Sequence, residues 1–181
     1  MLDNKRYKHS LSVQQMAREL ARIHGADEEK SSLAGLVHDC AKGMSPFQSF
    51  RTAKRYGIQL DEIELKHTGI LHAIIGAELA ADLFGINDLE VLNAIKSHTT
   101  GCSRMSLMDK VLYVADYAEP FRRYAGAAKV RKLAYTNIDV AMLEAIEQKI
   151  QHLLEKKILI HPRTIIARNE ILRRLRVISD K

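Results

Sequence analysis

Apolar residues recur along most of the chain at the three- and four-residue spacing that places side chains on one face of a helix. The alternating Val, Ile and Thr runs and the Asn-Gly turns that mark β-hairpins do not occur. The pattern therefore predicts an all-α fold of about eight or nine helices. They are expected at about 4–24, 27–37, 46–56, 69–84, 88–97, 106–119, 127–134, 137–157 and 162–178.

Several of these helices have marked ends. Gly25 is expected to end the first helix in a left-handed conformation. The third helix opens with Ser45 as its cap, Pro46 at the first helical position and Gln48 three residues after the cap. Pro120 is expected to end the sixth, because proline cannot continue a helix.

The composition is that of an ordinary globular protein: 181 residues, 46% apolar and 28% charged. We expect a single domain over 1–181, with a core at about 4–120 and C-terminal helices at about 126–181. No apolar run approaches the roughly 18 to 20 residues needed to cross a bilayer, and the polar N-terminus lacks the apolar stretch of a secretory signal. These features predict a cytoplasmic protein without a membrane partner.

The two cysteines and the charge narrow the chemistry only a little. Cys40 and Cys102 do not form a CxxC pair, so we expect reduced thiols rather than a disulfide framework or a zinc–thiolate site. The formal net charge of +6 would attract polyanions such as nucleotides, nucleic acid or an anionic membrane surface. Charge alone does not choose among these partners.

Ionisable side chains occur in or directly after apolar helices, where each needs a compensating partner. Asp116 lies in a run of apolar and aromatic residues, and an ionised carboxylate there is costly without a positive group nearby. His38 and Asp39 end a similarly apolar stretch, and His72 and His98 are each introduced by a largely apolar helix. Imidazoles and carboxylates without thiolates suit iron, manganese or zinc at a hydrolytic site, and we infer a metal centre.

Each of these residues alone has an ordinary alternative. A single histidine can be a core or helix-end residue with one hydrogen bond, and Asp116 could pair with a buried lysine. Their joint occurrence at comparable helix positions makes the purely structural interpretation the weaker one. His24, His152 and His161 lie at polar helix ends or among charged residues and are expected on the surface. His67 could line the pocket, and we leave it out of the metal set.

The order of these residues resembles the H…HD…H…H…D signature of HD-domain phosphohydrolases. The matching positions are His9, His38-Asp39, His72, His98 and Asp116. More narrowly, the chain resembles the YqeK family over nearly its whole length. The supporting strings are His38-Asp39-Cys40-Ala41-Lys42, Leu71-His72-Ala73, His98-Thr99-Thr100-Gly101, Tyr113 to Arg122 and Pro162 to Asn169. Cys40 departs from the aliphatic residue that is usual there, which does not affect a ligand position.

This resemblance implies an HD-domain helical bundle with a C-terminal helical extension, and hydrolysis of diadenosine tetraphosphate to two ADP by metal-activated water. It also implies iron, as one or two ions, with manganese or zinc as alternatives. The implied primary metal site consists of His9, His38, Asp39 and Asp116. Asp39 would bridge to a second, weaker site with His72 and His98. Asp39, His72 and His98 are the expected catalytic residues.

Phosphate binding requires cations beside the metals. The candidates are Lys42, Lys110, Arg122 and Arg123. We favour Arg122 over Lys110 because a planar guanidinium matches a phosphate with paired hydrogen bonds. Each of these residues could instead be a solvated helix charge.

Two further groups could reach a nucleotide. Thr99 and Gly101 follow a ligand histidine in a turn, where hydroxyl and backbone N–H groups can point at a substrate. Thr164, Arg168 and Asn169 could approach from the last helix. The alternative for Thr164 is a role at the start of that helix, and for Arg168 a place on its solvated face.

Two other functions remain open. One is an HD phosphohydrolase that acts on a nucleoside monophosphate, a deoxynucleotide or a cyclic nucleotide. The other is a non-enzymatic RNA- or ribosome-binding module, suggested by the net charge and by the cluster of Arg168, Arg173, Arg174 and Arg176. A binding module needs no buried metal ligands, and the chain lacks the aromatic-rich sheet motifs that stack bases. The expected partner is therefore a nucleotide with a polyphosphate chain rather than a nucleic acid, and a homodimer is left open.

Overall fold

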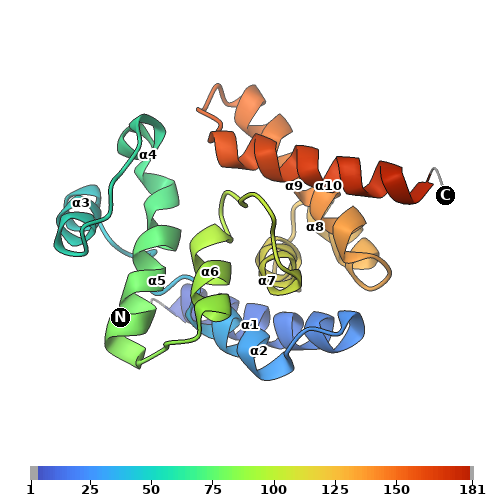
Figure 1. Cartoon of the computed structure of the whole chain (residues 1–181), viewed down its shortest axis with the longest axis horizontal. Coiled ribbons are helices and arrows are strands. Elements are labelled where there is room, and N and C mark those ends of the chain that lie inside the picture. Colours follow the sequence, from blue (N-terminus) through green and yellow to red (C-terminus); the bar gives the residue numbers. More distant parts are fainter. Residues whose placement is uncertain (1–3, 180–181) are drawn as a thin grey trace.

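The computed structural model describes residues 4–179, and helices account for all of the regular secondary structure in that range (Figure 1). It contains ten α-helices and one short 3₁₀ turn, η1. Their bounds are α1 Asn4–His24, α2 Glu28–Val37, α3 Pro46–Arg55, α4 Glu62–Lys66, η1 Thr68–Ile70, α5 Leu71–Phe84, α6 Leu89–Ser97, α7 Leu107–Ala118, α8 Ala125–Ala134, α9 Ile138–Glu155 and α10 Pro162–Ser179. The all-α prediction is confirmed.

Helix α7 lies at the centre of the bundle. It packs against α1, α2, α6, α8 and α9, and every residue from Val111 to Ala115 is buried (Figure 1). A helix that is apolar on all sides is stable only when other helices surround it, which explains why this segment lacks a polar face. Asp116, the next residue, is therefore held at the middle of the molecule.

The predicted helix boundaries agree closely with the structure. Gly25 has a φ of 80°, which is the left-handed conformation expected of the residue that ends α1. Ser45 and Gln48 form the reciprocal capping box at the start of α3, with Pro46 at its first position. The capping and stop residues thus fix where these helices begin and end.

The region between α3 and α5 was not predicted to be helical. It contains the five-residue helix α4, which is capped by Asp61 and Glu64, and the turn η1 follows it. Five residues are too few to show a helical apolar pattern, so the capping pair was the only local signal. The expected number of helices was accordingly too low.

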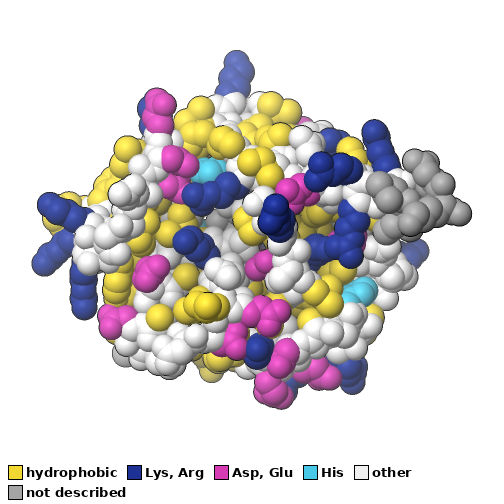
Figure 2. Space-filling model, in the orientation of Figure 1, with side chains coloured by type: hydrophobic (Ala, Val, Ile, Leu, Met, Phe, Trp, Pro, Cys, Tyr) yellow, Lys and Arg dark blue, Asp and Glu magenta, His cyan; other side chains and the backbone are white. Residues whose placement is uncertain are grey.

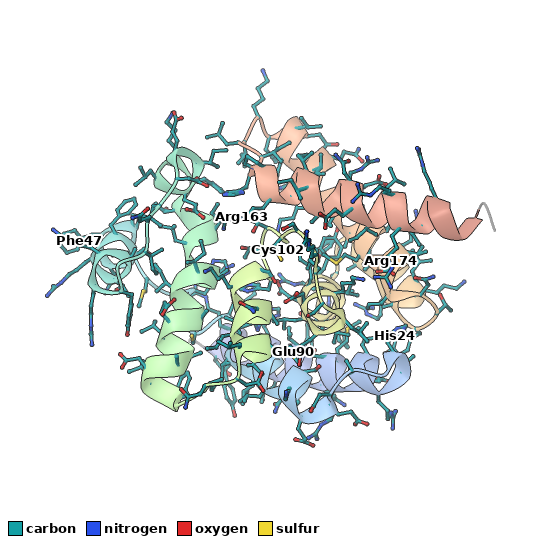
Figure 3. All side chains as sticks on the ribbon, in the orientation of Figure 1. His24, Phe47, Glu90, Cys102, Arg163 and Arg174 are labelled. Atoms are coloured by element: carbon teal, nitrogen blue, oxygen red, sulfur yellow. The ribbon has the colours of Figure 1, made fainter. Side chains whose placement is uncertain are left out.

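The prediction that His161 lies on the surface is wrong. Its side chain is 5% exposed, and its Nε2 atom lies 2.8 Å from Asp61 Oδ2. Arg163 Nη1 donates to Glu64 Oε1 at 3.2 Å, so the start of α10 is bound to α4 (Figure 3). His152 is exposed as predicted, whereas His24 is half-buried and bonds through Nε2 to the Ala134 carbonyl oxygen at 2.6 Å.

Basic side chains do not form a uniform surface. On the face shown in Figure 2, Lys and Arg side chains lie interspersed with Asp and Glu side chains. Within the C-terminal arginine cluster, Arg168 pairs with Glu147 at 2.6 Å and Arg174 lies 3.5 Å from Asp139. Among the described helices, none is both long and apolar enough to cross a membrane.

A close approach between α1 and α2 brings two candidate ligands together. At Gly35 an added Cβ atom would lie 2.8 Å from the Cα atom of Gln14, in the backbone of the facing helix. Only glycine allows this spacing, because the obstructing atoms are backbone and cannot rotate away. α1 carries His9 and α2 leads into His38, so the Gly35 contact sets the distance between these two histidines.

We expect Gly35→Ala to lower the free energy of unfolding by about 1 to 3 kcal/mol, because the added methyl group must push α1 and α2 apart. Urea denaturation followed by circular dichroism measures the change. Glu29→Ala on the same helix is the control, since the Glu29 side chain is 82% exposed and its ion pair with Arg18 is a surface one. Equal stability of the two variants would show that the helices can separate without cost.

Candidate metal centre

The structure gathers the candidate ligands at one place. His9 is on α1, His38 and Asp39 directly follow α2, His72 is in the first turn of α5 and His98 directly follows α6. Asp116, on α7, completes the set. Residues that are more than a hundred positions apart in the sequence thus face one another.

One group of donor atoms surrounds the Asp116 carboxylate. His9 Nε2 lies 3.0 Å from Asp116 Oδ1 and 4.0 Å from Asp39 Oδ2. His38 Nε2 lies 3.7 Å from each of the same two oxygen atoms. We call these four residues, with Asp39 contributing Oδ2, the first donor group.

A second donor group consists of Asp39 Oδ1, His72 and His98. The Nε2 atoms of His72 and His98 lie 3.2 and 3.6 Å from Asp39 Oδ1, and they are 3.1 Å apart. The two carboxylate oxygens of Asp39 therefore face different histidine pairs. Asp39 is the one residue in both groups, as the bridging role implied by the resemblance requires.

The histidine rings are held so that Nε2 faces the cluster. Nδ1 of His38, His72 and His98 bonds to the backbone carbonyl three residues earlier, at 2.7 to 2.8 Å. A hydrogen bond donated by Nδ1 places the proton there and leaves the lone pair on Nε2, which is the form that binds a metal. The ring orientations are thus set by the local backbone.

His9 is oriented by a side chain instead of a carbonyl. Its Nδ1 atom lies 3.1 Å from Oε1 of Glu119, whose side chain is 2% exposed, and Glu119 Oε2 accepts the N–H of Phe121 at 2.7 Å. Glu119 lies within the segment Tyr113 to Arg122 that supports the family resemblance, but no role was predicted for it from the sequence. The sequence feature that could have indicated this role is its position, as an acidic residue just after the apolar helix α7 and next to Pro120.

The donor set suits a divalent cation. His38 Nε2 and Asp39 Oδ1 are buried without a hydrogen-bond partner among the described residues, although such atoms normally have one. Ligand atoms about 2.0 to 2.2 Å from a shared ion lie about 3 to 4 Å apart, as these donors do. A cation bound between these atoms would therefore satisfy the unpaired donors of both groups.

The ionisation of the second donor group agrees with the binding of a cation. Burial lowers the pKa of His98 to about 4 and also lowers the pKa of His72, which keeps both imidazoles neutral. Burial raises the pKa of Asp39, but the nearby His72 and His98 rings outweigh it and hold the pKa below its usual range. Neutral imidazoles and an ionised carboxylate are the forms that coordinate a metal.

The thiol of Cys40 takes no part in either group. Its Sγ atom donates to the Gly76 carbonyl oxygen at 3.4 Å, and burial raises its pKa to about 11. The ligands of the described cluster are accordingly nitrogen and oxygen atoms, which suit iron, manganese or zinc.

Three of the predicted phosphate ligands lie at the cluster. Arg122 Nη2 is 2.9 Å from Asp116 Oδ1, and Lys42 Nζ is 2.8 Å from His72 Nε2. Both line a pocket of about 680 Å³ together with Arg123, His9 and Asp39. This basic pocket, which also includes Lys5, Arg6 and Lys8, opens directly onto the donor atoms.

Lys110 is placed elsewhere. Its Nζ atom lies 2.6 Å from Asp139 Oδ1 in a buried ion pair, and it lines a different pocket with Cys102 and Arg104. The residue lies six positions before Asp116, which is more than one and a half helical turns away on α7. The structure therefore does not bring Lys110 to the basic pocket.

The remaining substrate candidates lie between the cluster and α10. Thr99 is buried beside His98, and Gly101 has a φ of 69° and approaches Ala167 of α10. Thr164 is buried in the first turn of α10. Arg168 and Asn169 bond to each other, and Arg168 also binds Glu147, so both polar groups are held at the α9–α10 contact.

Lys149 is a cation near the cluster that sequence reasoning missed. It is on α9, its Nζ atom donates to the Thr99 carbonyl oxygen, and it lies 5.5 Å from the centre of the Tyr113 ring. The signal was its position: it continues the buried stripe that runs through Met142 and Ala145 at helical spacing. A lysine in that register must point into the bundle.

Comparison with known proteins agrees with this arrangement. Residues 6–120 match the family model described as the HD domain. The chain belongs to the HD-domain family, whose name refers to the histidine–aspartate pair found here at His38 and Asp39.

Relatives define the protein more narrowly. A symmetrical bis(5′-nucleosyl)-tetraphosphatase of Halalkalibacterium halodurans is 37% identical over 94% of this chain and 91% of its own length. Enzymes of the same name from Staphylococcus aureus and Bacillus subtilis are 36% and 34% identical, over 91% and 93% of this chain and 85% and 90% of their own lengths. The chain is thus a close relative of symmetrical tetraphosphatases, which favours an enzyme over a nucleic-acid-binding module.

A solved structure confirms the fold. It is described as a predicted HD superfamily hydrolase involved in NAD metabolism from Clostridium acetobutylicum. It is 40% identical, covers 96% of this chain and 92% of its own, and has a TM-score of 0.93. The core and the C-terminal helices therefore both occur in that relative.

We expect Glu119→Ala to weaken metal binding about 10- to 100-fold, because His9 would lose the partner that orients its ring. Titration of metal-free protein with Mn²⁺ measures the affinity, and the thermal midpoint tests whether the fold is retained. Glu119→Gln keeps an acceptor oxygen and is expected to retain most of the affinity. If the alanine variant binds metal as tightly as wild type, Glu119 has no orienting role.

Proposed function

We propose that this protein hydrolyses diadenosine tetraphosphate to two ADP. One observation carries the proposal: the two donor groups share Asp39 and open onto a basic pocket lined by Lys42, Arg122 and Arg123. A metal centre beside several cations suits a substrate whose reacting part is a chain of phosphates. The names of the relatives from Halalkalibacterium, Staphylococcus and Bacillus supply the class of substrate, a bis(5′-nucleosyl) tetraphosphate that is cut symmetrically, and the family resemblance supplies its adenosine form.

Iron is the metal we propose, as one or two ions, with manganese or zinc as alternatives. The first donor group would hold the tighter ion, because it combines two histidines with carboxylate oxygens of both Asp116 and Asp39. The second group, with one carboxylate oxygen and two histidines, would hold a weaker one. When bound, such ions activate water near neutral pH and neutralise phosphate charge.

The chain's own residues bind and orient the substrate. Arg122 presents its guanidinium at the mouth of the cluster and is 38% exposed, so a phosphate can reach its N–H groups. Lys42 has a similarly accessible ammonium group beside the second donor group. We propose that both contact phosphate oxygens once metal occupies the donors, while Arg123 lines the outer part of the same pocket.

The substrate roles of Thr99, Gly101, Thr164, Arg168 and Asn169 remain predictions, as does a cytoplasmic location, and a homodimer stays open. Support for a role of Thr99 comes from its buried position directly after His98. Arg168 has less support, because its guanidinium already binds Glu147. Its exchange is therefore expected to change activity less than exchange of Arg122.

Product analysis tests the proposed function. Protein loaded separately with iron and with manganese is incubated with diadenosine tetraphosphate, and the nucleotides are separated by ion-exchange chromatography. We expect ADP as the main product and little AMP or ATP, with Asp39→Ala inactive because it removes an oxygen from both donor groups. Equal amounts of AMP and ATP would overturn symmetrical cleavage. Faster hydrolysis of NAD, a deoxynucleotide, a nucleoside monophosphate or a cyclic nucleotide would identify a different substrate.

Arg122→Ala is expected to lower kcat/KM about 10- to 100-fold, which corresponds to roughly 1.4 to 2.7 kcal/mol of lost transition-state stabilisation. Metal content should not change, because Arg122 contributes no ligand atom. Arg122→Lys should restore only part of the activity, since lysine keeps the charge but not the paired donors. Arg51→Ala on α3 is the control. Wild-type kinetics in both Arg122 variants would refute a phosphate contact.

A further inference from the structure

A second pocket begins at the same metal ligand and extends in another direction. It has a volume of about 960 Å³ and lies between the end of α7, the start of α8 and helix α9. Asp116 and Arg122 line it near the cluster, and Arg122 also lines the basic pocket. We call this second space the α9 pocket. Its size is within the range of about 300 to 1,000 Å³ that is usual for small-molecule sites.

Lys149 is a cation that lines the α9 pocket. Its ammonium group donates to the Thr99 carbonyl oxygen, and among the described residues no carboxylate lies within ion-pair distance of it. Lys110, the other lysine with a buried environment in this region, is paired with Asp139 at 2.6 Å. A half-buried lysine without a carboxylate partner leaves positive charge available for an anion.

The surroundings of Lys149 destabilise its positive charge, so an anion beside it would be favourable. Burial lowers the pKa of Lys149 to about 8, and the carboxylate of Asp116 only partly offsets this effect. The positive charges of Lys42 and Arg122 lower it further. Three cations thus converge on the space around the donor groups, and a phosphate between them would relieve their mutual repulsion.

The α9 pocket also contains aromatic rings. The rings of Tyr117 and Tyr124 meet edge to face with their centres 5.2 Å apart, and Tyr124 is exposed. Gln148 and Gln151 also line the pocket, with their amides bonded to Tyr117, Glu144 and Glu155. Aromatic rings in the same pocket as a lysine without a carboxylate partner suit a nucleoside joined to phosphates.

The metal centre therefore adjoins two binding spaces. The basic pocket is lined by His9 and Asp39 and the α9 pocket by Asp116, while Arg122 and Tyr124 line both, so the two pockets meet at the metal ligands. A substrate cut at the middle of its phosphate chain has two halves that must leave the metals in different directions. Two pockets that meet at the metal ligands provide this arrangement.

We propose that the α9 pocket binds one nucleoside diphosphate half of the substrate, with Lys149 contacting its phosphates and Tyr124 its base. This inference rests on the proposed function for the identity of the substrate. It assigns to α9 a substrate-binding role that the resemblance did not supply.

Exchange of Lys149 tests the proposal in metal-loaded protein. Lys149→Met keeps the apolar length of the side chain, so we expect unchanged metal content and a thermal midpoint within about 3 °C of wild type. Loss of the charge should lower kcat/KM for diadenosine tetraphosphate about 10- to 100-fold and weaken ADP binding, measured by calorimetry, to a similar extent. Lys149→Arg should recover part of both. Lys156→Met, at the C-terminal cap of the same helix and outside the pocket, is the control.

Two results would overturn the proposal. One is a Lys149→Met protein with wild-type kinetics and ADP affinity. The other is loss of metal and of thermal stability in both the Met and the Arg variants, which would assign Lys149 to support of the turn at Thr99. Calorimetry with ADP needs no turnover, so it tests the pocket even if wild-type protein fails to cleave diadenosine tetraphosphate. That failure would refute the proposed function alone.

Discussion

The carboxylate of Asp39 faces four imidazoles, and the burial of this charge constrains the rest of the molecule. A 5% exposed carboxylate far from water is costly unless several polar groups surround it, and no single helix can supply them. Three helices besides α2 contribute a histidine to it: α1, α5 and α6. The bundle is therefore organised so that its helices converge on one residue at the end of α2.

Helix ends make this convergence compatible with the backbone. His38 and His98 directly follow the last residues of α2 and α6, where carbonyl groups lack partners within the helix. Their Nδ1 atoms satisfy carbonyls in that last turn, and His72 does the same with the turn before α5. One hydrogen bond thus completes a helix end and also directs Nε2 toward the metal position.

The helices and five of the six candidate ligands could be predicted from local signals in the sequence, whereas His9 entered only through the family resemblance. Apolar spacing, capping residues and an ionisable residue after an apolar run are all visible within about ten residues. Glu119 and Lys149 could not be assigned in the same way, since their roles depend on which helix lies opposite. Lys110 was a candidate for phosphate binding, but Asp139 of α9 neutralises it. Lys149, ten residues after Asp139 on the same helix, donates to the Thr99 carbonyl oxygen next to His98.

Two unlike pockets at one metal centre bear on how a symmetrical substrate is cut. The halves of diadenosine tetraphosphate are identical, yet Lys5, Lys8 and Lys42 line only the basic pocket, whereas Tyr117 and Lys149 line only the α9 pocket. Matching pockets therefore do not define the middle of the chain. The donor groups, where the two pockets meet, define it instead, because each half must place its inner phosphate at the metals held by Asp39 and Asp116. In this scheme the cleavage position follows from the distance between Lys149 and the metal ligands, and recognition of the second base adds affinity without changing the bond that is broken.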